Sequence, residues 1–310
     1  MSGDGFTLPA FAKVNLTLRV RGRRPDGYHE IETVFQTISL HDLITFELSA
    51  SGRIELACSD PDIPSDETNL VYRAAVALRE RYGVQQGARV TLEKRVPAQA
   101  GLGGGSSDAA VALLGLAHLW GVETNKDELK QLGARLGSDV PFFLEGGTAL
   151  GTGTGAEIQP LRDAPATPLV VVTPAVKVST AEGYAALKAP ALTKEGSAAN
   201  LSVSRAESLF AGSLREVMRN DFEGVVGRLH PEVERAREAL EASGARRAML
   251  SGSGSSVFGV FDSKGEAERA ARVLGAEAAW RAQACATVTR GEYLGALGVC
   301  AGLLAASPSA

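Results

Sequence analysis

Apolar and polar side chains alternate along residues 13–20, near the start of the chain. The apolar positions are Val14, Leu16, Leu18 and Val20, and the polar positions are Lys13, Asn15, Thr17 and Arg19. A period of two is the pattern of a β-strand that buries one face. Successive side chains of a strand point to opposite sides, so Lys13 and Asn15 are predicted to lie together, opposite the apolar face.

The rest of the chain shows strand and helix patterns in turn. Strands are expected over residues 31–48, as two strands around a turn at His41 and Asp42, and at 90–96, 169–172, 248–250, 257–261 and 285–289. Helices are expected at 69–82, after a glycine cluster up to Gly121, from Asn125 to Gly137, and at 204–218, 231–243 and 265–274. Strands interleaved with helices indicate an α+β fold.

A loop-like segment bounded by Pro160 and Pro168 is the candidate domain boundary. It predicts a first domain over residues 1–162 and a second over 163–296. The remaining residues, 297–310, are rich in alanine and glycine. Chain ends of this kind are often poorly ordered, so these residues are predicted to form a frayed tail.

The composition narrows the class of protein. The 310 residues carry a formal net charge of -4, with acidic and basic residues interspersed, whereas a nucleic-acid-binding protein carries a basic face or stripe. Residues 1–9 lack the pattern of a secretory signal, and no apolar stretch reaches bilayer-spanning length. Cys58, Cys285 and Cys300 are far apart and lack metal-ligand spacing. A cytoplasmic protein is expected, with a small-molecule substrate and no nucleic-acid or membrane partner.

Glycine is concentrated in three short clusters, at residues 101–105, 146–155 and 252–254. The first runs through Ser106 and Ser107 into a helical pattern. Glycine lets the backbone take positive φ and approach a ligand closely, and the first turn of a helix presents unpaired N–H groups. Together with the helix dipole they favour an anion, so the cluster predicts a phosphate site with Ser106 or Ser107 as the helix N-cap.

The common phosphate-binding motifs do not fit this loop. A P-loop requires a lysine at a place that no lysine occupies here, and the dinucleotide fingerprint requires Gly or Ala where Ser106 stands. Residues 151–156 match that fingerprint, but Pro160 follows within one turn, so no helix can carry a pyrophosphate there. The protein-kinase motifs His-Arg-Asp and Asp-Phe-Gly are missing. A less common nucleotide-binding loop remains.

Three separate motifs resemble those of the GHMP kinases, which include galactokinase, homoserine kinase, mevalonate kinase and phosphomevalonate kinase. The segment from Pro97 to Ala110 is similar to their ATP loop, residues 250–256 to their glycine-rich C-terminal motif, and residues 12–16 to their N-terminal motif. All three occur in the family's order. The resemblance implies a small-molecule kinase that uses ATP and Mg²⁺. It also implies a first domain like domain 2 of ribosomal protein S5, a ferredoxin-like second domain, and an active site between them.

Two further stretches resemble one branch of the family. Residues 24–30 read Arg-Pro-Asp-Gly-Tyr-His-Glu, and residues 136–142 read Leu-Gly-Ser-Asp-Val-Pro-Phe. Both are typical of the GHMP kinases in the non-mevalonate route to isoprenoid precursors. These enzymes transfer the γ-phosphate of ATP to the 2-hydroxyl of a sugar alcohol joined to cytidine through a diphosphate.

The resemblance implies a role for individual residues. Asp139 corresponds to the base that receives the proton of the substrate hydroxyl, and Lys13 lies beside it. The residues implied for ATP binding are Asn69, Pro97, Gly101, Leu102, Gly103, Gly104, Gly105, Ser106 and Ser107, and Ser107 is also a candidate ligand for Mg²⁺. Those implied for the acceptor are Asn15, Tyr28, His29, Tyr184, Gly252, Ser253 and Gly254. Tyr28 and Tyr184 are expected to stack on the two faces of the cytosine, with His29 at its edge.

Two other functions remain open at this point. The first is another GHMP kinase, such as homoserine or mevalonate kinase, although a substrate without a base has no need of stacking aromatics. The second is a sensor that binds nucleotide and metabolite without chemistry. The presence of both Lys13 and Asp139 favours an enzyme, since a phosphoryl-transfer site needs a group to position the hydroxyl and a charge to stabilise the transition state.

Overall fold

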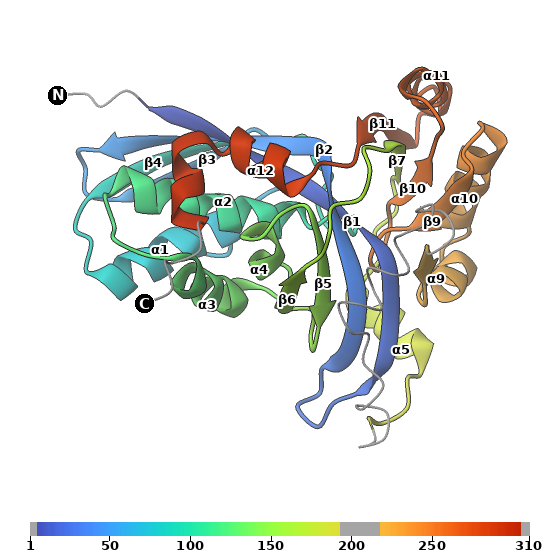
Figure 1. Cartoon of the computed structure of the whole chain (residues 1–310), viewed down its shortest axis with the longest axis horizontal. Coiled ribbons are helices and arrows are strands. Elements are labelled where there is room, and N and C mark those ends of the chain that lie inside the picture. Colours follow the sequence, from blue (N-terminus) through green and yellow to red (C-terminus); the bar gives the residue numbers. More distant parts are fainter. Residues whose placement is uncertain (1–4, 193–217, 305–310) are drawn as a thin grey trace.

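The computed structural model describes residues 5–192 and 218–304. In these residues the chain forms two β-sheets, each with its own helices (Figure 1). None of the helices in the described part is both long and apolar enough to cross a membrane. The helix expected at 204–218 lies almost entirely outside the described residues.

The first sheet is built on a long antiparallel pair, β1 (Phe6–Arg23) and β2 (His29–Ser49). The strand order is β3-β4-β2-β1-β8, with β5 paired to β2 and β6 to β5. The other strands are β3 (Ile54–Cys58), β4 (Gly87–Glu93), β5 (Thr148–Thr152), β6 (Glu157–Pro160) and β8 (Arg219–Asn220). Both faces of β1 are buried around its middle, because Lys13 and Asn15 are covered as well as the apolar side chains.

The turn expected at His41 and Asp42 is wrong, since β2 runs through these residues. The polar Asp42 side chain is accommodated inside the protein. It is fully buried, accepts hydrogen bonds from the backbone N–H of Arg95 (2.5 Å) and Val96 (2.8 Å), and pairs with Lys94. The local irregularity is a shift in the β1–β2 register beside Phe11 instead of a chain reversal.

Helices cover one face of the first sheet. They are α1 (Leu70–Tyr82), α2 (Gly104–Leu119), α3 (Lys126–Leu136) and the short α4 (Val140–Phe143). The side chains of Asn69 and Asn125 cap α1 and α3 by accepting backbone N–H groups of the first turn, which confirms the predicted start of both helices. Twelve of the sixteen residues of α2 are buried, so this helix forms the centre of the first domain's core.

The second sheet has four antiparallel strands in the order β11-β7-β10-β9. These are β7 (Pro168–Pro174), β9 (Arg247–Leu250), β10 (Val257–Val260) and β11 (Trp280–Ala286). Its helices are α5 (Thr180–Leu187), α9 (Glu223–Leu229), α10 (Pro231–Ala242) and α11 (Lys264–Leu274). From one edge of the sheet to the other, the strands are the fourth, first, third and second of the domain in chain order, which is the ferredoxin-like arrangement that was expected.

The two faces of the second sheet serve different cores. On one face, Val170 and Val172 share a core with Leu240 of α10 and Leu274 of α11. The alternate residues of β7, Leu169 and Val171, join an apolar cluster with Val14 and Leu16 of β1. The second sheet is therefore packed against β1 and β2 through a shared hydrophobic layer. This layer holds together the walls of the cleft described below.

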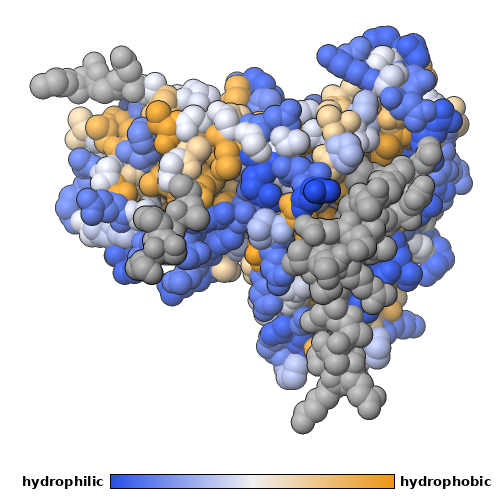
Figure 2. All heavy atoms as spheres, in the orientation of Figure 1, coloured by the Kyte–Doolittle hydropathy of each residue, from blue (hydrophilic) through white to orange (hydrophobic). Residues whose placement is uncertain are grey.

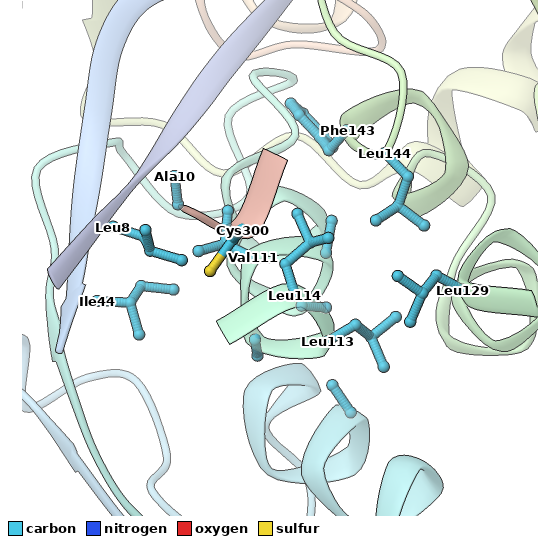
Figure 3. Close-up of a cluster of buried hydrophobic side chains, with 14 of the residues drawn as sticks. Leu8, Ala10, Ile44, Val111, Leu113, Leu114, Leu129, Phe143, Leu144 and Cys300 are labelled. Carbon is cyan, nitrogen blue, oxygen red and sulfur yellow. The ribbon is translucent and has the colours of Figure 1, made fainter. Parts of the chain in front are cut away.

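The end of the chain returns to the first domain. After β11, α12 (Arg290–Ala296) and the 3₁₀ helix η1 (Gly298–Leu304) pack on its core. Figure 3 shows Cys300 within the same group of side chains as Leu8, Ala10 and Val111. The frayed tail expected from residue 297 is not what the structure has through Leu304, because Leu297, Cys300 and Leu304 are buried. Residues 305–310 lie outside the described part. We propose that the boundary between the two domains lies at residues 162 and 163.

Hydropathy is distributed unevenly over the visible surface. In Figure 2 hydrophobic side chains gather on the first domain near α12 and η1, whereas α10 and α11 at the right are covered mainly by hydrophilic side chains. Val299 of η1 is a large apolar side chain with 71% of its surface exposed.

Candidate active site

A cleft of about 1150 Å³ lies between the two sheets and brings together residues from both domains. Eleven of the residues singled out in the sequence line it: Lys13, Asn15, Tyr28, His29, Gly101, Gly103, Asp139, Tyr184, Gly252, Ser253 and Gly254. The first and third glycine clusters, which are about 150 positions apart in the chain, therefore border the same space.

Lys13 and Asn15 form a fixed pair at the base of the cleft. The Nζ of Lys13 donates to Asn15 Oδ1 at 2.7 Å and to the carbonyl of Gly101 at 2.9 Å. Asn15 in turn donates from Nδ2 to Thr33 Oγ1 at 2.7 Å. The two side chains lie together, as their shared side of β1 predicted, but both are buried, whereas the pattern predicted burial of the apolar face alone. Burial lowers the pKa of Lys13, and the nearby carboxylate of Asp139 opposes that shift.

Asp139 faces Lys13 across this base. Its Oδ2 lies 3.5 Å from Lys13 Nζ, and 31% of its side chain is exposed. Asp139 occupies the N-cap position of α4, yet its side chain makes no capping hydrogen bond. The carboxylate of Asp139 is therefore not occupied in capping α4. It lies in the wall of the cleft, where a ligand can reach it.

The first glycine cluster crosses over Lys13 before entering α2. Gly101 and Gly103 have φ values of +78° and +70°, the left-handed region that glycine adopts without strain. A side chain at Gly103 would meet the ring of Phe143 at 2.8 Å and the stem of Lys13 at 3.1 Å. The loop thus needs glycine both for its backbone conformation and for its close approach to Lys13.

The helix behind this loop begins earlier than predicted. Gly103 is the N-cap of α2, so Ser106 and Ser107 lie within its first turn and neither is the N-cap. Glycine at the cap and left-handed φ bring the chain into the helix without a capping side chain. The Oγ of Ser107 is consequently free of a capping bond: it is buried and has no hydrogen-bond partner among the described residues.

The second glycine loop packs directly on the first. Ser251 donates from Oγ to the carbonyl of Gly101 at 3.0 Å, and the N–H of Ser256 donates to the carbonyl of Ala100 at 3.0 Å. Asn220 supports this loop from below, because its Nδ2 donates to the carbonyl of Gly252 at 2.8 Å. The two loops therefore form one continuous rim, and Asn220 helps to shape it, although no sequence motif singled this residue out.

The aromatic residues lie at the other end of the cleft. Tyr184 stacks on His29, with ring centroids 4.3 Å apart and an angle of 17° between the planes, and it meets Phe222 edge-on at 4.9 Å. Tyr28 is 63% exposed and has no ring contact among the described residues. Burial, and then the charge of Asp139, raise the pKa of Tyr184 to about 12. Tyr184 and His29 are thus brought together, whereas the two tyrosines do not yet enclose a space.

The remaining residues implied for ATP do not line this cleft. These are Asn69, Pro97, Leu102, Gly104, Gly105, Ser106 and Ser107. The side chain of Asn69 is engaged in capping α1, where it accepts from Val71 N–H at 2.8 Å and donates to the carbonyl of Pro64 at 2.7 Å. The carbonyl of Leu102 accepts from the N–H of Lys13 at 2.9 Å and so ties the loop to β1.

A buried charge cluster lies under the first turns of α2. Lys94 pairs with Asp42 and, at 2.8 Å, with Asp108. Burial opposes the charge of Lys94, but the two carboxylates outweigh this effect and raise its pKa. Sequence patterns could not reveal this cluster, because its three members lie on β2, after β4 and on α2 and meet only in the folded chain.

Comparisons with known proteins decide the family. The family described as GHMP kinases N terminal domain matches residues 69–147, and the one described as GHMP kinases C terminal matches residues 205–279. The 4-diphosphocytidyl-2-C-methyl-D-erythritol kinase of Pelotomaculum thermopropionicum is 45% identical over 254 residues, which cover 82% of this chain and 88% of that protein. The chain belongs to this kinase family, a branch of the GHMP kinases. It is therefore a small-molecule kinase, as the three motifs predicted.

Solved structures agree with this assignment. A crystal structure of 4-(cytidine 5'-diphospho)-2C-methyl-D-erythritol kinase has a TM-score of 0.76 and 39% identity, and the match covers 91% of this chain and 99% of that one. A homoserine kinase from Cytophaga hutchinsonii has a TM-score of 0.66 at 20% identity, covering 92% and 95%. The second likeness shows the shared fold alone. The predicted two-domain α+β fold of the GHMP kinases is confirmed.

Proposed function

We propose that this protein transfers the γ-phosphate of ATP to the 2-hydroxyl of 4-diphosphocytidyl-2-C-methyl-D-erythritol, a step in the non-mevalonate synthesis of isoprenoid precursors. The observation that carries the proposal is the joint presence, in one cleft, of the Lys13–Asp139 pair and of the aromatic group around Tyr184 and His29. The first suits transfer to a hydroxyl, and the second suits a substrate that carries a base.

Asp139 is proposed as the base. It is close enough to Lys13 to be held by its charge, it remains accessible from the cleft, and it has no capping bond to give up. A positioned carboxylate can take the proton of the attacking hydroxyl as the bond to phosphorus forms. The transferred phosphoryl group then leaves ADP and is joined to the oxygen of the acceptor.

Lys13 is proposed to stabilise charge at the transferred group. Its ammonium is fixed by three acceptors, Asn15 Oδ1, the carbonyl of Gly101 and Asp139. Catalysis of phosphoryl transfer depends mainly on positioning and electrostatics, and a pre-oriented cation does not have to reorganise during the reaction. Asn15 is proposed to hold the ammonium of Lys13 in place beside the hydroxyl of the substrate.

The glycine loops are proposed to hold the phosphates of ATP. The N-terminus of α2, which begins at Gly104 behind the left-handed Gly103, offers unpaired N–H groups and the positive end of its dipole. The adjoining loop of Gly252, Ser253 and Gly254 borders the same space. Together the loops place the donor phosphate near Lys13.

The residues present also fit Mg²⁺. The hydroxyl of Ser107 and one carboxylate oxygen of Asp108 are buried without a hydrogen-bond partner in the described part of the chain. No cluster of three or more His, Cys, Asp or Glu side chains there could hold a metal alone, but Mg²⁺ in kinases is usually held by one or two protein oxygens together with phosphate oxygens and water. We propose Ser107 as such a ligand. When bound, Mg²⁺ neutralises the charge that develops on the phosphates.

A cytoplasmic location and the lack of a nucleic-acid partner are part of the same proposal. Cys58, Cys285 and Cys300 are all free, which suits a reducing compartment.

A coupled assay for ADP release tests the function. The purified protein is given ATP and Mg²⁺ with the cytidyl substrate, with homoserine or with mevalonate. ADP release should depend on the cytidyl substrate and be absent with the other two. Turnover of homoserine or mevalonate instead would assign the protein to another branch, and ATP binding without turnover of any of the three would favour a sensor.

A further inference from the structure

Three basic side chains at the rim of the cleft have no acidic partner. Arg23, Lys177 and Lys188 all line the cleft and are exposed, and none of them forms an ion pair with any described residue. Neighbouring Arg24, which does not line the cleft, pairs with Glu30 and Asp26. The cleft as a whole carries Lys13 in addition to these three, against only two acidic side chains. Such an excess of positive charge favours anionic ligands.

The fold brings Arg23 and Lys188 to the same end of the cleft. Arg23 is the last residue of β1 and lies directly opposite His29 in the β1–β2 pair. Its N–H donates to the carbonyl of Pro190 at 2.8 Å, two residues after Lys188. Burial lowers the pKa of His29, and the positive charge of the nearby Arg23 lowers it further.

Lys177 lies at the opposite end of α5. That helix has eight residues and is about 12 Å long at 1.5 Å per residue, and Figure 1 shows it alongside the lower parts of β1 and β2. Its first residue, Thr180, is joined to Ser253 of the second glycine loop by a hydrogen bond of 2.8 Å between their hydroxyls. Tyr184 lies between the two ends. The cations therefore follow α5 from the glycine loop to the aromatic group.

We propose that the positive potential of Arg23, Lys177 and Lys188 makes this rim of the cleft a subsite for the diphosphate of the acceptor. This inference rests on the proposed function. In a ligand whose base stacks near Tyr184 and whose hydroxyl meets Asp139, the linking group lies in the same cleft as these cations. A diphosphate diester carries two negative charges. Charge-assisted hydrogen bonds from lysine and arginine recognise such a group. The subsite selects cytidine diphosphate compounds over uncharged cytidine.

The test compares the binding of CDP with that of cytidine. Arg23→Gln, Lys177→Met, Lys188→Met and the Lys177→Met/Lys188→Met double variant are measured by calorimetry beside the unaltered enzyme. Lys264→Met is the matched control, since Lys264 is 87% exposed on α11 and outside the cleft. Each single change should reduce the preference for CDP over cytidine by about ten- to a hundredfold, the range of one charge-assisted hydrogen bond. The double variant should lose more.

Cytidine affinity and the KM for ATP should stay within about twofold of the unaltered enzyme, while the KM for the cytidyl substrate rises with the loss of CDP binding. Lys188→Arg should retain most of the preference. If Arg23→Gln disturbs the β1–β2 pair, which a thermal melt will reveal, the lysine variants alone carry the test.

Three results would overturn the subsite. One is an unchanged CDP preference in the double variant, the second is a loss equalled by Lys264→Met, and the third is a rise in the KM for ATP instead, which would assign the cations to the donor phosphates. Each of these can occur while the enzyme still turns over the cytidyl substrate. Failure of the proposed function would look different, because the unaltered protein would then neither phosphorylate that substrate nor bind cytidine.

Discussion

Asp139 is the single residue on which the proposed chemistry depends most directly. Its carboxylate lies 3.5 Å from Lys13 and is open to the cleft. The Asp139→Asn change keeps the shape but cannot take a proton, so turnover should fall by about 10²- to 10⁴-fold, the usual contribution of a general base. The Kd for ATP should be nearly unchanged. Steady-state kinetics and calorimetry measure the two quantities.

A matched change elsewhere separates this effect from a general loss of charge. Asp62→Asn alters an exposed aspartate in the loop before α1 and should leave turnover as it is. A turnover of Asp139→Asn within about twofold of the unaltered enzyme would remove Asp139 from the mechanism.

Substitutions of Tyr28 and Tyr184 test whether the substrate carries a base that stacks on these rings. Stacking of a base on an aromatic ring contributes about 1–3 kcal/mol, so each Tyr→Ala change should raise the KM for the cytidyl substrate by about five- to a hundredfold. The KM for ATP should scarcely change. Tyr184→Phe keeps the ring and should behave almost as the unaltered enzyme does.

The structure sharpens this prediction. The rings of Tyr184 and His29 are in face-to-face contact at 4.3 Å, which leaves no room for a base between them, so a base must stack on an outer face or displace one ring. An acceptor KM that responds to Tyr184→Ala but not to Tyr28→Ala would indicate a single stacked face. Weakened ATP binding with an unaffected cytidyl substrate would place both rings in the adenine site and argue against the proposed acceptor.

The loop that leads into α2 is the element on which donor binding depends. Gly103 has left-handed φ, and a methyl group there would meet Phe143 and Lys13. Gly103→Ala should therefore weaken ATP binding by tenfold or more, with a strain cost of about 1–2 kcal/mol for a left-handed residue. Gly121→Ala is the control, because Gly121 has a similar φ of +62° but no atom within 4 Å of the added carbon. If both variants bind ATP equally well, the loop is only a turn.

Sequence patterns predicted the helices and strands that depend on residues close together in the chain. The alternation in β1 placed Lys13 and Asn15 on one side, and the caps at Asn69 and Asn125 marked the starts of α1 and α3. The prediction failed at Asp42, since a polar residue that is usually found in turns is held here by backbone donors from the segment after β4. It failed again at the start of α2, where glycine provides the cap that serine was expected to provide.

The candidate site could be predicted only as far as the motifs reach. Lys13, Asp139 and the glycine loops stand in recognisable sequence contexts, and the cleft brings them together. Asn220 and the Lys94–Asp108 pair have no such context, because their roles come from contacts between distant parts of the chain. The contact of Tyr184 with His29 likewise depends on how the second sheet packs against β1 and β2.

At the scale of the whole molecule, the chain crosses between its domains more than once. β8, which follows α5 in the sequence, pairs with β1 of the first sheet, and α12 and η1 return to the first domain's core. Arg290 fixes this return by donating to the carbonyls of Thr148 (2.7 Å) and Leu161 (3.2 Å). A division at residue 162 would therefore leave both β8 and the last segment in the second domain, although they pack with the first.

This return predicts a stability effect that is separable from catalysis. The hydroxyl of the fully buried Tyr293 donates to the carbonyl of Phe143, at the end of α4. Tyr293→Phe leaves that carbonyl without its partner, and a buried unsatisfied polar group costs about 1–3 kcal/mol. Urea unfolding should show this loss in the free energy of unfolding as a lower midpoint with an unchanged slope.

The matched control is Tyr72→Phe on α1, since the Tyr72 hydroxyl has no hydrogen-bond partner among the described residues. That variant should unfold as the unaltered protein does. Both variants should keep turnover and both KM values, because Tyr293 lies behind α4 and does not line the cleft. An equal midpoint for Tyr293→Phe and Tyr72→Phe would show that the last segment adds little stability through this bond. A fall in turnover comparable with that of Asp139→Asn would instead mean that the segment positions the start of α4, and with it the carboxylate.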